Sequence, residues 1–438
     1  MSMSKSAMPT TAAPLLPALG FKLSLMMFLQ YAIWGAWLPL LYPFLMGHRH
    51  FTADQCGVIL ASGAIGAVIG PFLAGQLADR HFNTERVLAA SHFGGAVLVW
   101  FLASTERFEV FVGMSLVYGL IYAPTLSLTN SLALHHLPDR DRDFGKVRLW
   151  GTVGWIFAGI TMAQWLFFQH TPEGAAEVVT AAQKAGMTDA FKFAAGLGLV
   201  MAFFCLTLPK TPPSKGESKN ATFEALGEIK RKPLLILFLL AIPVSCIHQF
   251  YFVHTASFLG GIQVGAEGFV AFLNKLFGVG GGGLMTIGQM SEILVLAAIP
   301  FLAKSMSRRS LLAIGLIAYA LRMWLFGNFE LVGPAGLMFG LALHGLCFGC
   351  FIFVAFMIVD ENTTGDVRAS AQGLFNLVIV GVGIIVGSLI ATAATRWATT
   401  DGVLSYTELF SYPMYASIAC LIILLLTYPR ENTRKQNS

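Results

Sequence analysis

Apolar stretches of about 20 residues recur along the whole chain, and this feature restricts the possible folds more than any other. A helix of that length crosses the hydrocarbon core of a bilayer. The 438 residues contain twelve such stretches, at 19–46, 56–79, 86–105, 108–134, 146–169, 188–208, 234–262, 283–303, 309–328, 331–359, 368–395 and 404–428. In addition, 56% of the residues are hydrophobic and only 12% are charged, which lies outside the range of soluble domains. We therefore expect an all-α integral membrane protein with twelve transmembrane helices.

The positions of Lys and Arg predict how these helices are oriented. An even number of spans places both termini on one side, and most of the 28 Lys and Arg residues fall in segments on that same side, including 140–148 and 230–232. Positively charged residues accumulate on the cytoplasmic side of membrane proteins, so we expect both termini in the cytoplasm. This excess of Lys and Arg also explains the formal net charge of +5. We therefore expect the positive residues to interact with anionic lipid headgroups and not with nucleic acid.

The chain is divided into two similar halves. Residues 210–233 are rich in Pro, Ser and Lys, as linkers are, and they separate the first six apolar stretches from the last six. The pattern G-x-V-R begins at Gly145, before the fifth stretch, and again at Gly365, before the eleventh. Such a parallel repeat of six helices is typical of major facilitator transporters. We expect two pseudo-symmetric six-helix bundles, at 1–209 and 234–438, joined by a cytoplasmic linker at 210–233.

The sequence lacks the common motifs of enzymes and metal sites. Neither H-E-x-x-H nor G-x-S-x-G occurs in it. Cys347 and Cys350 form a C-x-x-C pair without a second pair of ligands, so we interpret them as packing residues of a helix. The stretch 278–283 matches G-x-G-x-x-G, but no βαβ unit surrounds it. We therefore expect no enzyme activity, no cofactor and no metal site.

One carboxylate, Glu292, lies well inside a predicted span. A charged group at the centre of a bilayer costs about 2.5 to 3.5 kcal/mol and usually marks a substrate or proton route. Gln289 precedes it by three residues, so both polar side chains lie on the same face of a helix. The alternative is a protonated Glu292 that joins two helices for structure alone.

Further polar and aromatic side chains interrupt the other spans. Arg148, Thr152 and Trp155 lie along one stripe of the fifth helix and suit a ligand with hydroxyl groups and an aromatic ring. The alternative for Arg148 is an arginine that extends to the cytoplasmic surface. In the seventh helix Gln249 is a candidate ligand, whereas we interpret each neighbouring histidine as a packing residue. Other side chains that could line the same cavity are Gln30 and Trp34 in the first helix and Tyr122 in the fourth.

Five ordered stretches carry a resemblance to a known family. Residues 28–41, 122–133, 147–155, 288–302 and 367–375 resemble the matching stretches of the nucleoside:proton symporter family, the bacterial nucleoside permeases of the major facilitator superfamily. The resemblance implies that Arg148, Thr152, Gln249, Gln289 and Glu292 contact nucleoside. It also implies that Trp155 stands where a relative has Phe, which preserves an aromatic surface.

The chain departs from the family pattern at two positions. Phe252 stands where the family has Asn in the seventh helix, and Gly349 stands where the family has an Asp in the tenth. A second membrane carboxylate is therefore missing, which leaves the proton stoichiometry and the coupling itself open. His344, in the same predicted helix, is a candidate substitute.

From the resemblance we expect a secondary active transporter that imports nucleosides by proton symport with alternating access, with Glu292 as the proton-coupling residue. The alternatives are an uncoupled nucleoside facilitator and a major facilitator carrier for another small polar solute, such as a sugar. We expect a monomer in the bacterial inner membrane, whose partners are nucleoside, protons and membrane lipids. The sequence leaves open the choice between purine and pyrimidine, the tolerance of deoxyribose and the affinity.

Overall fold

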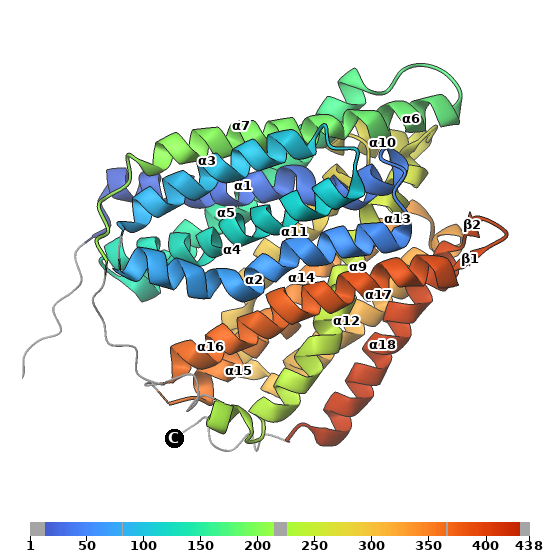
Figure 1. The fold of residues 1–438 in the computed structure, drawn as a ribbon. Helices are drawn as coiled ribbons and strands as arrows, with labels where there is room; N and C mark the ends of the chain where they lie inside the picture. The colour runs from blue at the N-terminus through green and yellow to red at the C-terminus, as the bar shows by residue number, and fades with distance from the viewer. Residues whose placement is uncertain (1–13, 81, 214–225, 365–366, 430–438) are drawn as a thin grey trace, which may run out of the picture.

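The computed structural model describes residues 14–80, 82–213, 226–364 and 367–429, and it is almost entirely helical. The expected all-α architecture is therefore confirmed. Half of the predicted linker, residues 214–225, and Gly365 of the second G-x-V-R pattern lie outside the described residues. The helices form two groups that lie side by side (Figure 1), which we call the first and the second helix group.

The first helix group comprises α1 to α7. Its bounds are α1 Pro17–Gly47, α2 Ala53–Arg80, α3 Thr84–Leu102, α4 Phe108–His136, α5 Arg140–Gln169, α6 Ala176–Gly186 and α7 Thr188–Cys205. In this group α1 packs on α5, α2 on α4, and α3 on α7. Glycine permits the closest of these approaches, because a Cβ atom on Gly66 of α2 would collide with the backbone of Gly119 in α4.

The second helix group comprises α9 to α18. Its bounds are α9 Leu234–Gln263, α10 Gly268–Phe277, α11 Gly282–Ser305, α12 Arg308–Gly327, α13 Phe329–Ala342, α14 His344–Leu346, the π-helix η1 Cys347–Phe353, α15 Val354–Glu361, α16 Arg368–Asn376, the π-helix η2 Leu377–Val382, α17 Gly383–Trp397 and α18 Tyr406–Thr427. Between α17 and α18 the strands β1 Thr399–Thr400 and β2 Val403–Leu404 form an antiparallel hairpin, with Thr399 opposite Leu404. In this group α12 packs on α18, and α9 on α17.

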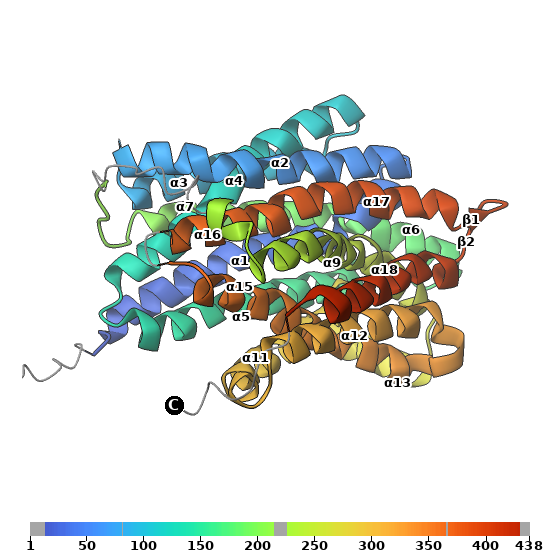
Figure 2. The same cartoon turned by 90° about the horizontal axis from the view of Figure 1, so that it is seen from below.

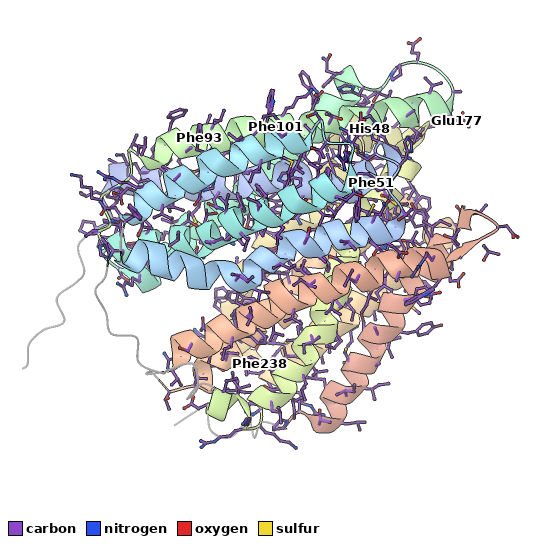
Figure 3. All side chains as sticks on the ribbon, in the orientation of Figure 1. His48, Phe51, Phe93, Phe101, Glu177 and Phe238 are labelled. Atoms are coloured by element: carbon purple, nitrogen blue, oxygen red, sulfur yellow. The ribbon has the colours of Figure 1, made fainter. Side chains whose placement is uncertain are left out.

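Eleven helices or helix runs in the described residues are long and apolar enough to cross a membrane. They include the run α6 to α7 at Ala176–Cys205 and the run α13 to α15 at Phe329–Glu361. The predicted span at 86–105 corresponds to α3, which is not among the eleven. With α3 the helices match the twelve expected stretches, and α3 presents an apolar outer face as a helix in contact with lipid does. On that face Phe93 and Phe101 point outward, with 52% and 56% of their surface exposed (Figure 3).

The two ends of the bundle differ. α6, α10 and the β1–β2 hairpin lie at one end, which we call the hairpin end, whereas the start of α1 and the last turn of α18 lie at the other, which we call the terminal end (Figure 1, Figure 2). The helix pairs α2 with α17, α5 with α11, and α1 with α9 join the two groups. Towards the terminal end the ribbons of the two groups diverge (Figure 1).

Polar contacts hold the two groups together near the hairpin end. The Val279 amide donates to the Ala163 carbonyl at 3.1 Å, and Gln164 Nε2 donates to the carbonyls of Lys275 and Leu276 at 2.9 and 3.0 Å. Two further contacts link α1 or α2 to α17, namely Tyr42 with Thr395 at 3.1 Å and Asp54 with Arg396 at 2.8 Å. The bundle is therefore closed by hydrogen bonds at its hairpin end.

Candidate functional site

Glu292 lies on α11, at the boundary between the two helix groups. Its side chain is 13% exposed, and its Oε2 atom lies 3.6 Å from Nε2 of His344, which begins α14. The positive charge of Arg148, on α5 of the first group, acts on the same carboxylate. Glu292 therefore lies beside an imidazole of its own helix group and within the electrostatic influence of a cation from the other, and its side chain is nearly buried.

Gln289 lies one turn before Glu292 on α11 and is buried, with 5% of its surface exposed. Its amide oxygen has no hydrogen-bond partner among the described residues. A buried carbonyl without a partner is costly, and most such groups in proteins are paired. Gln289 is therefore an acceptor available to a donor group of a bound ligand.

The α5 stripe contributes a cation and an aromatic surface. The Arg148 guanidinium lies 4.1 Å from the centre of the Tyr31 ring of α1, which holds the arginine within the bundle. Trp155 meets Trp34 of α1 edge to face at 6.5 Å, and it meets Phe252 of α9 edge to face at 6.1 Å. The Trp155 ring thus bridges the two helix groups. Thr152, between Arg148 and Trp155 on α5, is half-buried.

Gln249 lies on α9 and is half-buried. Its Nε2 atom donates to the Ser388 hydroxyl of α17 at 3.0 Å. Because an amide nitrogen carries two hydrogens and the amide oxygen is a separate acceptor, this bond leaves part of the side chain available to a ligand.

Gln30 and Tyr122 are engaged inside the first helix group. Gln30 is fully buried, its Nε2 donates to the Thr125 hydroxyl at 2.8 Å, and its Oε1 lies 3.0 Å from Nε2 of His92. The Tyr122 hydroxyl donates to the Gln30 backbone carbonyl. The structure thus brings Trp34 to Trp155 but uses the polar groups of Gln30 and Tyr122 to join α1, α3 and α4.

A cluster that the sequence analysis did not assign lies behind Glu292. Arg322 of α12 is fully buried, and its Nη1 atom lies 2.9 Å from Nδ1 of His344. The guanidinium carbon lies 4.1 Å from the centre of the Tyr251 ring. His248 stacks on His344 with ring centres 5.4 Å apart, and its Nδ1 lies 2.7 Å from the Tyr319 hydroxyl. Arg322 is an ionisable residue within a span, so the criterion that singled out Glu292 could have found it.

Gly349 and Phe252, the two departures from the family pattern, both have structural neighbours. A Cβ atom on Gly349 would lie 2.6 Å from Cγ1 of Val295 on α11, so the position has no room for a side chain. The Phe252 ring lies edge to face with His248 at 5.2 Å and with His344 at 6.0 Å. Phe252 therefore extends the aromatic surface that begins at Trp155.

Comparison with known proteins identifies the family. The family model described as Nucleoside H+ symporter matches residues 18–434. The chain belongs to the nucleoside H+ symporter family. Three relatives from Escherichia coli support this assignment. YegT is 31% identical over 84% of this chain and 82% of its own length, the xanthosine permease is 27% identical over 88% and 90%, and the nucleoside permease NupG is 26% identical over 88% and 90%.

Solved structures confirm the predicted fold class for this member of the family. The crystal structure of the nucleoside transporter NupG matches with a TM-score of 0.79 at 24% identity, covering 94% of this chain and all of that one. The D-xylose-proton symporter matches with a TM-score of 0.66 at 15% identity over 92% and 97% of the two chains. The fold is therefore that of major facilitator transporters. Membership of the nucleoside H+ symporter family makes the protein a multi-pass membrane transporter and not an enzyme.

Proposed function

We propose that this transporter imports nucleosides across a bacterial inner membrane by proton symport. The observation that carries the proposal is the position of Glu292, a nearly buried carboxylate at the boundary of the two helix groups, 3.6 Å from His344 and under the electrostatic influence of Arg148 from the first group. Membership of the nucleoside H+ symporter family supports both the substrate class and the coupling ion. Two relatives are named as permeases of nucleoside and of xanthosine.

The moving parts in this proposal are the two helix groups. We assign residues 1–209 and 234–438 to two bundles that rock against each other, with 210–233 as a cytoplasmic linker. Both termini are assigned to the cytoplasm, which places the hairpin end outside the cell. The hydrogen bonds that close the hairpin end then correspond to a conformation closed to the outside, and they must break before substrate can enter.

The substrate would lie between Arg148, Gln249, Gln289 and Glu292. Ribose hydroxyls both donate and accept hydrogen bonds, which suits the unpaired Gln289 oxygen and the Glu292 carboxyl as acceptors and the Arg148 guanidinium as a donor. The base would lie against Trp155, with Trp34 and Phe252 completing the aromatic wall on either side. His344 would border the same space from the second helix group, behind Glu292.

Glu292 would carry the proton. With the site open to the acidic outside, the carboxyl takes up a proton and loses its charge, which lowers the cost of moving it through the closed bundle. On the more alkaline cytoplasmic side the proton leaves, and the negative charge then favours release of the substrate and return of the carrier. We expect the protein to work as a monomer in the lipid bilayer.

Uptake into proteoliposomes tests the substrate and the coupling together. Labelled uridine and adenosine are offered with and without an imposed pH gradient, acidic outside, and unlabelled nucleosides, free bases and sugars compete. We expect accumulation above the outside concentration only with the gradient, and competition by nucleosides only. Equilibration without concentration would identify an uncoupled facilitator, and competition by a sugar would identify a carrier of another solute.

A further inference from the structure

A fully buried arginine lies close to the proton-carrying site, and the proposed binding of nucleoside does not use it. We propose that Arg322 and His344 act together as positioning residues that stabilise the charged form of Glu292 and so set the pH at which this carrier releases its proton. We call this pair the Arg322–His344 brace. The inference rests on the proposed function, because it concerns how the same carboxylate handles its proton.

The hydrogen bond between Arg322 and His344 fixes the state of the imidazole. A guanidinium only donates hydrogen bonds, so Nδ1 of His344, 2.9 Å from Arg322 Nη1, must be the acceptor. The ring is therefore neutral, and its single N–H group lies on Nε2. Nε2 is the atom that faces Glu292 Oε2 at 3.6 Å. Arg322 thus turns His344 into a donor directed at the carboxylate.

The buried charge of Arg322 also favours the ionised form of Glu292. Arg322 is fully buried, its Nε and Nη2 atoms have no hydrogen-bond partner in the described part of the chain, and no carboxylate there lies within ion-pair distance of it. A buried charge without a partner is strongly unfavourable. Glu292 lies just beyond the His344 ring, so its negative charge compensates the guanidinium across the imidazole when the carboxyl is ionised.

The other charged and titratable groups around Glu292 and the Arg322–His344 brace are compatible with a neutral His344 and an ionised Glu292. The positive charge of Arg148 on α5 also acts on Glu292 and favours the carboxylate. From α9, His248 stacks on His344, and the Tyr251 ring contacts both His344 and Arg322. From α12, Tyr319 bonds to His248, and Cys347 of η1 lies within the electrostatic reach of Arg322. A second proton on His344 would have to displace the Arg322 hydrogen bond, so Glu292 is the group that exchanges the proton.

Glu292 releases its proton directly to water, and no proton passes through the His344 ring. The O–H bond of Glu292 breaks, the proton passes to water on the open side, and the electron pair stays on the carboxylate. His344 keeps its Nε2–H throughout, and Arg322 keeps its charge. The pair therefore supplies, as fixed donor and fixed positive charge, an influence on the Glu292 proton from within the second helix group.

Three variants, compared with wild type in proteoliposomes, test this inference. Arg322→Met removes the charge at similar volume, and His344→Phe removes both ring nitrogens. His344→Gln keeps one acceptor and one donor, so it is the matched control, and wild type is the reference. Two quantities are measured across pH, namely nucleoside accumulation driven by a pH gradient and nucleoside exchange without a gradient. Exchange needs binding and reorientation but no net release of a proton.

We expect Arg322→Met and His344→Phe to shift the half-maximal pH of driven accumulation upward by about one unit, because the carboxylate loses its stabilising partners. Accumulation at neutral internal pH should fall by about tenfold. In Arg322→Met, whose side chain does not contact the substrate space, exchange at acidic pH should stay close to wild type. His344→Gln should keep the wild-type midpoint. If Arg322→Met does not fold, the comparison of His344→Phe with His344→Gln serves as the test.

The inference is overturned if accumulation and exchange fall in proportion without a shift in midpoint, which is the behaviour of residues with a structural role alone. It is also overturned if His344→Phe keeps the wild-type midpoint. Failure of the proposed function gives a different result, because wild type itself would then show no nucleoside accumulation driven by a pH gradient, whether or not it exchanges nucleoside.

Discussion

The hydrogen bonds of Gln164 permit a quantitative prediction about the closure of the hairpin end. Its Nε2 atom donates to the backbone carbonyls of Lys275 and Leu276 at 2.9 and 3.0 Å, across the two helix groups. A typical hydrogen bond contributes about 0.5 to 1.5 kcal/mol net, and Gln164 is half-buried, so we take about 1 to 2 kcal/mol for both. Gln164→Ala should therefore lower the ratio of closed to open hairpin end by about 5- to 30-fold.

A cysteine between the helix groups reports this opening. Thr286 of α11 is 1% exposed, and a Cβ atom on Gly159 of α5 would lie 2.9 Å from its methyl carbon. In Thr286→Cys, the thiol becomes accessible from the hairpin end only when the groups separate there. The assay is the rate of modification by a membrane-impermeant maleimide. Five of the six native cysteines are buried and Cys246 is half-buried, and the wild-type chain gives the background.

The expected result is modification about 5 to 30 times faster in Gln164→Ala with Thr286→Cys than in Thr286→Cys alone. Gln169→Ala is the matched control, because Gln169 is the same residue type at the end of the same helix and is exposed. An equal rate in all three proteins would show that the Gln164 contacts do not hold the hairpin end closed, and the reasoning would be wrong.

Two further predictions follow from contacts described above. Gly349→Ala should lower the free energy of unfolding by about 1 to 3 kcal/mol, because the added methyl group overpacks against Val295. The second change Val295→Ala should restore most of this loss, as measured by thermal unfolding. Equal stability of wild type, the single variant and the double variant would contradict the prediction. A cleavable thiol cross-link between cysteines that replace Asp54 and Arg396 should stop transport until it is cleaved, because α2 and α17 must separate at the hairpin end. Continued uptake by the cross-linked protein would contradict the assigned movement.

Much of the fold could be predicted from the sequence because length and hydropathy alone define a membrane-spanning helix. The expected stretches correspond to the helices, since each backbone group in lipid must be paired within its own helix. The short helices α6 and α10 were not expected, because neither is long enough to give the signal of a span. The π-helices η1 and η2 were not expected either, because hydropathy does not distinguish them from an α-helix.

The candidate site could be predicted only in part. Glu292 and Arg148 stand out because an ionisable residue in a span is costly, and the same argument applies to Arg322. The pairing of Arg322 with His344 could not be predicted, because it depends on how α12 and α14 pack beside α11. From the sequence we interpret the histidines beside Gln249 as packing residues, and the stacking of one of them, His248, on His344 could not be predicted for the same reason. The structure likewise explains why position 349 is glycine, because a Cβ atom there would collide with Val295, and this contact could not be predicted from the sequence.

The most direct test of the central claim measures proton and nucleoside movement at once. Proteoliposomes that contain a pH-sensitive dye receive an inward nucleoside gradient with no initial pH difference. We predict that the wild-type protein acidifies the interior as nucleoside enters, and that Glu292→Gln exchanges labelled nucleoside without any change of internal pH. If Glu292→Gln still carries protons together with nucleoside, Glu292 is not the coupling residue and the account is contradicted.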